Sequence, residues 1–179
     1  MVVIGVDPGL TGACSVIDHN GLRAVFDLPT MKIPGVGEKA LVPKKIDGRA
    51  FCVLLLHHAP ASGAKPTFAI EAVGTQGVGI SIQTAASLLR SLGALETVAE
   101  CLRFPVTYIN SQKWKRFYGL IDHNKDPNLS ASQQSALTKK RSMECARRLY
   151  PGCADIARAK DHNRAESLLI AHWLMRELA

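Results

Sequence analysis

The segment VVIGVDPGLTGACSVIDHNGLRAVFDL (2–28) is the clearest indication of architecture in this 179-residue chain. It holds an apolar run that ends in Asp7, the turn signal Pro8-Gly9, a second apolar run at 12–17 and an alternating run at 22–28. Short apolar runs bounded by turn residues are typical of strands, and the Asn-Gly pair before the third run is a strong hairpin signal. We therefore predict that three consecutive antiparallel strands open the fold.

Predicted strands and helices alternate along the rest of the sequence. The patterns predict strands at 67–73 and 105–110, and helices at 46–58, 81–102, 112–119, 136–149 and 162–178. We expect a mobile loop at 30–45, a glycine-rich loop at 74–79 and a flexible surface loop at 121–135. The chain length suits one domain, so we predict a single α/β domain over residues 1–179.

The composition excludes several classes of protein. A hydrophobic content of 47% argues against wholesale disorder, and no apolar run approaches the roughly 20 residues of a bilayer span, so we expect no membrane partner. The first ten residues lack the basic start of a signal peptide. The five cysteines are scattered and form no CxxC pair, which predicts reduced thiols and a cytoplasmic protein of a bacterium or phage-infected host, or else a mature organellar protein.

The positive charge is concentrated in one segment. The chain has 22 basic and 15 acidic residues, a net charge of +7, and residues 113–148 carry nine of the basic residues against three acidic ones. Such a segment favours a polyanionic partner such as a nucleic acid, although a solvated helical face would have the same composition.

Two carboxylates lie inside apolar strand patterns, Asp7 at the end of VVIGVD and Glu71 within FAIEAV. An ionised carboxylate is costly to bury unless it is paired or binds a metal. Neither strand contains a basic residue that would pair with its acid locally, so both acids are candidate site residues.

The C-terminal helix pattern adds Glu166, which lies one turn from Leu169 and so is expected to face the sheet. Asp161 lies about 140° from Glu166 around an ideal helix, so the two converge only if Asp161 stands at the helix start, outside regular geometry. His162 is a rival ligand, four residues before Glu166, and a simple capping role for Asp161 stays open.

Together the four acids predict a site for a hard divalent cation. Carboxylate oxygens suit Mg²⁺ or Mn²⁺, and two such ions about 4 Å apart activate water for phosphodiester hydrolysis. No GxSxG or Walker A motif competes with this interpretation. The candidate catalytic and metal-binding residues are Asp7, Glu71, Asp161 and Glu166.

Four segments resemble the RuvC-type Holliday junction resolvases. They are IGVDPGLTGA (4–13), AIEAV (69–73), SLLRSLGALETVAECLRFPVTYINSQKWKRFYGL (87–120) and KDHNRAESLLIA (160–171). The last segment is most similar to the phage branch and to the plant chloroplast resolvase. The resemblance implies a ribonuclease H-like fold with a mixed five-stranded sheet flanked by helices. It also implies a homodimer and Mg²⁺- or Mn²⁺-dependent cleavage of four-way DNA junctions by paired nicks.

Carried onto this chain, the family pattern assigns the metal to the same four acids. The housekeeping bacterial members have an acid or histidine three residues before the last acid, where this chain has Asn163. The resemblance therefore assigns the metal-ligand role to Asp161 in preference to His162. The candidate DNA-binding residues are Lys113, Lys115, Arg116, Lys139, Lys140, Arg141 and Lys160. We expect Trp114 to be part of the core.

The helix at 81–102 is more apolar than one buried face requires, so it is either the dimer interface or a helix packed within its own domain. Three other functions stay open: a junction-binding protein that has lost catalysis, a related nuclease for other branched DNA, and an actin-like or sugar-kinase-like ATPase. The last would need two such domains and a nucleotide cleft.

Overall fold

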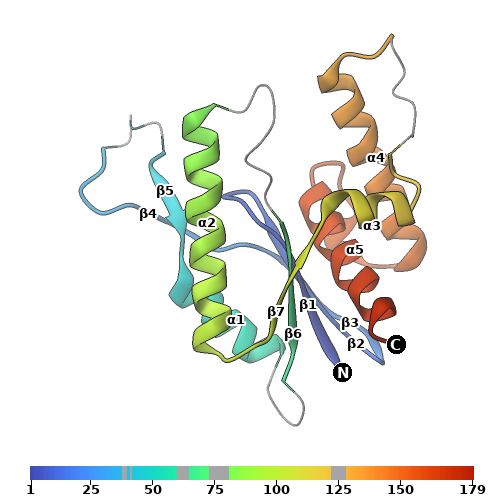
Figure 1. Ribbon diagram of the computed structural model, residues 1–179, viewed down its shortest axis with the longest axis horizontal. Coiled ribbons are helices and arrows are strands. Elements are labelled where there is room, and N and C mark those ends of the chain that lie inside the picture. The colour runs from blue at the N-terminus through green and yellow to red at the C-terminus, as the bar shows by residue number, and fades with distance from the viewer. Residues whose placement is uncertain (38–39, 41, 60–64, 73–80, 122–127) are drawn as a thin grey trace.

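The computed structural model describes residues 1–37, 40, 42–59, 65–72, 81–121 and 128–179. Its centre is a five-stranded sheet with the strand order β3-β2-β1-β6-β7 (Figure 1). The strands are β1 (Val2–Asp7), β2 (Ala13–Asp18), β3 (Gly21–Asp27), β6 (Thr67–Glu71) and β7 (Val106–Ile109). Strands β1, β2 and β3 pair antiparallel, whereas β1, β6 and β7 pair parallel, so the sheet is mixed as predicted.

Helices cover both faces of this sheet. Figure 1 shows α1 and α2 on one side and α3, α4 and α5 on the other. Their bounds are α1 (Gly48–His58), α2 (Ile82–Cys101), α3 (Ser111–Phe117), α4 (Ala131–Leu149) and α5 (His162–Glu177). A short 3₁₀ helix, η1 (Ala154–Ile156), precedes α5. No helix in the described ranges is long and apolar enough to cross a membrane.

The period-two alternation of β1 divides its side chains between two hydrophobic clusters. Val3 packs with residues of α4 and α5, whereas Ile4 and Val6 pack with residues of α1 and α2. Asp7 has the same parity as Val3, and Glu71 has the same parity as Ala69, which also belongs to the α5 cluster. The alternation therefore directs both acids towards the face that α5 covers.

Gly5 lets α5 lie directly on β1. A Cβ atom at this position would be 2.3 Å from the carbonyl oxygen of Ser167 and 2.5 Å from the backbone nitrogen of Ala171. Only glycine permits so close an approach of helix backbone to strand backbone. This contact fixes how far α5, and hence Glu166, lies from the sheet.

The structure confirms the three opening strands, the two later strands and the predicted helices, with changes at their ends. One expectation is wrong: within 30–45 the chain forms a two-stranded antiparallel sheet of β4 (Thr30–Lys32) and β5 (Lys44–Ile46). Helix α4 also begins five residues earlier than predicted, because Ser130 and Gln133 form a capping box. The predicted loop at 74–79 and residues 122–127 of the predicted loop at 121–135 lie outside the described residues.

Candidate active site

Three of the four predicted acids meet at one edge of the sheet. Strands β1 and β6 are parallel, and Val6 pairs with Ile70. Asp7 and Glu71 are the next residues of the two strands, so both stand at the carboxyl edge of the sheet. Glu166 reaches this edge from the first turns of α5. All three line a pocket of about 330 Å³, which we call the carboxylate pocket. The carboxyl ends of parallel strands are where α/β sheets place their ligands.

Burial and neighbouring negative charge raise the pKa of two acids of the carboxylate pocket, Asp7 and Glu71. Burial raises the pKa of Asp7 well above its usual value, and the negative charges of Glu166 and Glu71 raise it further. Burial also raises the pKa of Glu71, with a smaller contribution from Glu166 that the cation of Lys115 opposes. Three crowded carboxylates of this kind attract cations, because a positive charge relieves both desolvation and mutual repulsion.

Lys115 supplies one such positive charge. Its Nζ lies 3.7 Å from Oε1 of Glu71 and 3.6 Å from Oε2 of Glu166. Burial would lower the pKa of Lys115, but the charges of Glu166, Glu71 and Asp7 outweigh burial and raise it. Lys115 is therefore stabilised in its protonated form, and its ammonium group lies between Glu71 and Glu166.

Strand β7 accounts for the position of this lysine. Glu71 pairs with Ile109 at the end of β7, and the Asn110 side chain then caps α3 by accepting a hydrogen bond of 2.8 Å from the backbone N–H of Gln112. Helix α3 thus starts beside Glu71 and presents Lys115 to the pocket one turn later. Trp114 is fully buried, which confirms the prediction that it belongs to the core.

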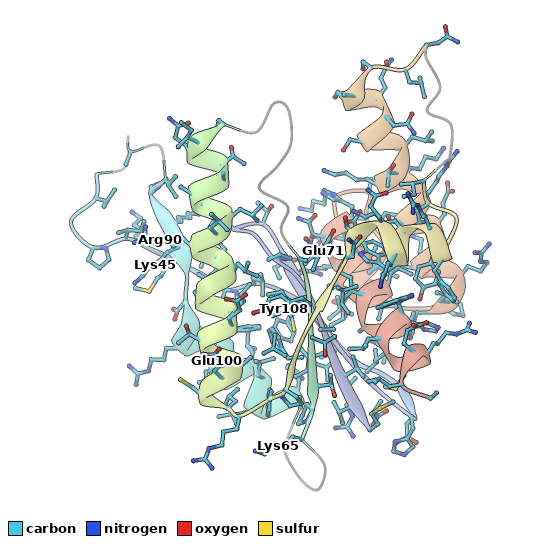
Figure 2. The ribbon with its side chains drawn as sticks, in the orientation of Figure 1. Lys45, Lys65, Glu71, Arg90, Glu100 and Tyr108 are labelled. Carbon is cyan, nitrogen blue, oxygen red and sulfur yellow. The ribbon has the colours of Figure 1, made fainter. Side chains whose placement is uncertain are left out.

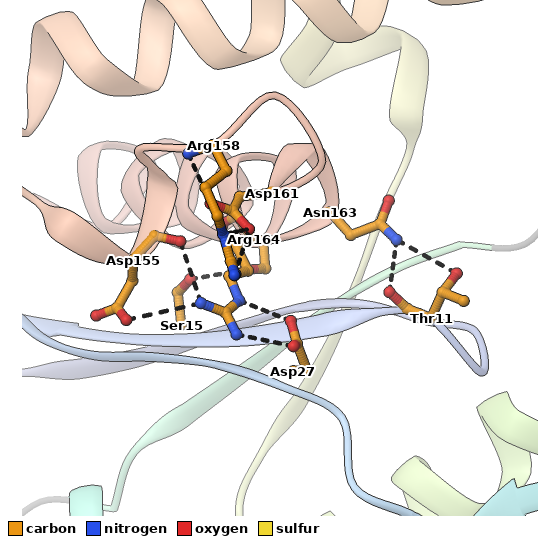
Figure 3. Close-up of polar contacts among 9 residues, drawn as sticks. Thr11, Ser15, Asp27, Asp155, Arg158, Asp161, Asn163 and Arg164 are labelled. Atoms are coloured by element: carbon orange, nitrogen blue, oxygen red, sulfur yellow. Dashed lines mark hydrogen bonds and ion pairs between the residues drawn. The ribbon is translucent and has the colours of Figure 1, made fainter.

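Two further residues complete the surroundings of Glu166: Ser142, which the sequence did not single out, and Asn163. The Ser142 hydroxyl of α4 lies 3.2 Å from Oε1 of Glu166 and 3.0 Å from the carbonyl oxygen of Thr138, so its one hydrogen is shared between these two acceptors. Asn163 lies one turn before Glu166 on α5 and also lines the carboxylate pocket. Its side-chain amide donates a 2.5 Å hydrogen bond to the carbonyl oxygen of Thr11, which ties α5 to the turn after Asp7 (Figure 3). The sequence resemblance marked this position, three residues before Glu166, only as a departure from the acid or histidine of the bacterial members.

The structure does not bring Asp161 to the other three acids. Asp161 stands at the N-cap position of α5, which is the position that convergence with Glu166 requires. Its carboxylate, however, contacts Arg158 (Figure 3). It accepts a 2.8 Å bond from the Arg158 backbone N–H and another of 2.8 Å from the guanidinium, and these bonds lower the pKa of Asp161. His162, the rival ligand, lies in a neighbouring pocket of about 440 Å³ with Lys139 and Lys140.

Further polar contacts hold α5 on the antiparallel strands. Arg164 donates two hydrogen bonds to the Asp27 carboxylate at the end of β3, of 2.6 and 2.7 Å (Figure 3). The hydroxyls of Ser15 and Ser167 are 2.6 Å apart and buried. These contacts and the close approach at Gly5 fix the position and rotation of α5, so they also fix the direction of Glu166.

The predicted DNA-binding residues divide into two groups. Lys115 and Lys139 line the carboxylate pocket, and Lys139 also lines the adjoining pocket that contains His162. The others are not among the described lining of the carboxylate pocket; Lys113, Arg116, Lys140 and Lys160 are exposed, and Arg141 is half-buried.

The donor atoms of the carboxylate pocket suit a hard divalent cation. Asp7, Glu71 and Glu166 offer carboxylate oxygens, which Mg²⁺ and Mn²⁺ prefer. As the side chains stand, the described acidic, histidine and cysteine residues form no group of three that encloses an ion, and Lys115 contacts two of the acids. An ion would therefore bind by a rotation of the carboxylates around it and would compete with the Lys115 ammonium.

Comparisons with known proteins now bear on the fold. Neither protein-family models nor curated proteins match the sequence. Among solved structures, RuvC of Thermus thermophilus in complex with a Holliday junction substrate matches with a TM-score of 0.58 and 20% identity. A second Thermus thermophilus RuvC structure matches with a TM-score of 0.59 and 18% identity, and each match covers 99% of this chain and 96% of the other. The chain has the RuvC fold. The predicted ribonuclease H-like sheet is thereby confirmed.

Proposed function

We propose that this protein is a metal-dependent nuclease that resolves four-way DNA junctions by paired phosphodiester hydrolysis, as a crossover junction endodeoxyribonuclease. The observation that carries the proposal is the carboxylate pocket: three acids from β1, β6 and α5 converge beside a half-buried lysine on a RuvC fold. The matched RuvC structure contains a Holliday junction substrate, which supports the same substrate class here. The sequence resemblance favours the phage and plant chloroplast branch.

The acids of the pocket would bind the metal, and its lysines would bind the phosphate. Asp7, Glu71 and Glu166 would hold Mg²⁺ or Mn²⁺, expected as two ions, and the metal would supply Lewis-acid activation of water. Ser142 orients Glu166, because its hydroxyl bonds one carboxylate oxygen and leaves the other towards the pocket. Asp161 stays the candidate fourth ligand, a role that requires its carboxylate to leave Arg158.

Two lysines would act on the DNA. Lys115 is held protonated by the acids, so it can donate a charged hydrogen bond to a phosphodiester oxygen that enters the pocket. Lys139 lines the pocket from α4 and is exposed, which suits an electrostatic contact with the neighbouring phosphate.

A junction has two strands to cut, so we expect the protein to act as a homodimer in the cytoplasm of its host. Helix α2 buries one side, including Leu95 and Ala99, within its own domain. On its outer side Ile82 and Leu89 are exposed. Both interpretations of this helix therefore have support, and the outer side is the candidate dimer interface.

A cleavage assay on a synthetic four-way junction tests the proposal. Glu71→Gln should bind the junction but leave both strands intact in Mg²⁺ or Mn²⁺, whereas Glu177→Gln, which changes an exposed acid at the other end of α5 from Glu166, should cleave like the wild type. Full cleavage by Glu71→Gln would refute the site. Wild-type binding without cleavage in either metal would make the protein a non-catalytic junction binder.

Asp161→Asn separates the two roles of that residue in the same assay. A loss of cleavage with unchanged thermal stability would support a metal ligand. Cleavage at the wild-type rate with lowered stability would support the structural role that its bonds to Arg158 indicate.

A further inference from the structure

The two-stranded sheet of β4 and β5, which we call the β4–β5 ribbon, extends from the body of the protein beside α2 (Figure 1). Its base is anchored, because Ile46 is buried in the core and Asp47 caps α1 by accepting a 3.0 Å bond from the backbone N–H of Ala50. Backbone bonds close both ends of the ribbon, from Asp47 to Pro29 at 2.8 Å and from Ile33 to Pro43 at 3.0 Å. An isolated pair of three-residue strands is marginally stable, so this anchoring gives the ribbon its defined position.

The ribbon presents positive charge. Lys32 and Lys44 are directly opposite each other in its register, and both are exposed. Like charges at directly opposite positions of an antiparallel pair are destabilising. Lys45 follows on the other face of β5, and Arg90 is exposed on the neighbouring helix α2 (Figure 2).

These cations lie outside the segment 113–148 that holds most of the net charge. Within the described ranges, no carboxylate forms an ion pair with Lys44, Lys45 or Arg90. Three basic side chains from two packed elements therefore give the molecule a second concentration of positive charge, with Lys44 and Lys45 on the two faces of the ribbon, on the opposite side of the carboxylate pocket from α4.

A groove connects this surface with the carboxylate pocket. A pocket of about 390 Å³ lies between the turn after β1 and the first turns of α2, and it shares Pro8 and Leu88 with the carboxylate pocket. Its far wall is formed by Val42 and Pro43, which directly precede Lys44. The polar side chains along it are hydroxyls and one amide, contributed by Thr11, Gln83, Thr84 and Ser87.

We propose that the β4–β5 ribbon and Arg90 bind the phosphate backbone of a DNA arm that leaves the carboxylate pocket along this groove. The inference rests on the proposed function, in which the pocket receives a phosphodiester of branched DNA. Groups without charge line the groove, and cations lie at both of its ends, Lys115 and Lys139 at one and the ribbon at the other. A DNA backbone that lies in the groove is therefore bound by cations at the two ends of the groove. These phosphate contacts fix the direction of the DNA arm without reading its sequence.

Binding measured without cleavage tests this surface. Fluorescence anisotropy in EDTA, with a labelled synthetic four-way junction, gives the affinity at several salt concentrations for the wild type and for the double variant Lys44→Gln, Lys45→Gln. If both lysines contact phosphates, the slope of log K against log salt should fall by about 1.8 and Kd at 0.1 M salt should rise by up to about 60-fold. Arg90→Gln should act in the same direction with about half that change in slope, about 0.9.

The matched control removes the same charge at the other end of the sheet. Lys65 and Arg103 are exposed and lie just before β6 and β7, which end at the edge of Glu71. Figure 2 shows Lys65 at the edge opposite Glu71. The double variant Lys65→Gln, Arg103→Gln should keep the wild-type slope and affinity. Equal losses in both double variants would mean that only the net charge matters, and this would overturn the proposal.

The outcomes also separate this proposal from the proposed function. If the wild type binds and cleaves the junction but Lys44→Gln, Lys45→Gln has an unchanged salt slope, the ribbon proposal is wrong and the nuclease stands. If the wild type does not bind the junction at all, the proposed function itself fails. Circular dichroism of each variant shows that an affinity change comes from a folded protein.

Discussion

Replacement of Gly5 by alanine tests the packing that places Glu166. The new Cβ would lie 2.3 Å from the Ser167 carbonyl oxygen, 2.5 Å from the Ala171 nitrogen and 2.7 Å from the Ala171 Cβ. Two of these atoms are backbone, so no side chain can rotate away to relieve the clash. Helix α5 must move by at least about 0.7 Å, and overpacking that shifts backbone costs about 1–3 kcal/mol.

Two measurements follow from this displacement. Urea unfolding should show a free energy of unfolding lowered by about 1–3 kcal/mol, which is a fall in Tm of roughly 2–12 °C for a domain of this size. Because Glu166 precedes Ser167, it moves with the helix, and a displacement near 1 Å can lower a cleavage rate by about 100-fold. The variant should therefore lose activity beyond what its unfolded fraction explains.

Gly93→Ala is the matched control, because nothing lies within 4 Å of a Cβ at this position of α2. Alanine in a helix interior is more favourable than glycine, so this variant should gain about 0.5–1 kcal/mol. If Gly5→Ala is as stable and as active as the wild type, α5 does not lie on β1 as described, and the positioning of Glu166 by Gly5 is refuted.

Two further predictions concern charge. Asp7 and Glu71 have raised pKa values in the folded protein, so the stability that they contribute is present near pH 4 and is lost as the pH rises through their pKa values in the folded state. Urea unfolding in EDTA from pH 4.5 to 8 should therefore show a free energy of unfolding that falls by up to about 1.4 kcal/mol per pH unit for each group. Mg²⁺ should oppose this fall, and stability that rises over the same range in EDTA would contradict it. Arg164→Lys should lose about 1 kcal/mol in the same assay, because lysine cannot make the two parallel bonds to the partly exposed Asp27; wild-type stability would show that the bidentate geometry contributes nothing.

The parts of the site that the sequence predicted are those governed by regular periodicity. The apolar runs of β1 and β6 identified Asp7 and Glu71 as acids in otherwise apolar strands, and the helical period placed Glu166 towards the sheet. These inferences depend only on the geometry of one element at a time. That geometry is the same wherever the element lies.

Asp161 and the β4–β5 ribbon depend on contacts between elements, which periodicity does not contain. The direction of the Asp161 carboxylate is decided by Arg158, whose backbone and guanidinium both reach it from the turn before α5. The ribbon has strands of only three residues, too short for an alternation pattern, and its register depends on Ile46 entering the core and on Asp47 capping α1. The start of α4, by contrast, could have been predicted from the sequence, because the spacing of Ser130 and Gln133 matches a capping box.

The two halves of the sheet contribute differently to the carboxylate pocket. The parallel half supplies the pocket's own groups, since β1 and β6 end in acids and β7 leads into the helix that carries Lys115. The antiparallel half supplies no lining residue, but Ser15 and Asp27 hold α5 by bonds to Ser167 and Arg164. Glu166 is therefore positioned both by the close approach of α5 to β1 at Gly5 and by these bonds from strands outside the pocket. It follows that substitutions on β2 and β3 should weaken Glu166 placement while leaving the acids of β1 and β6 where they are.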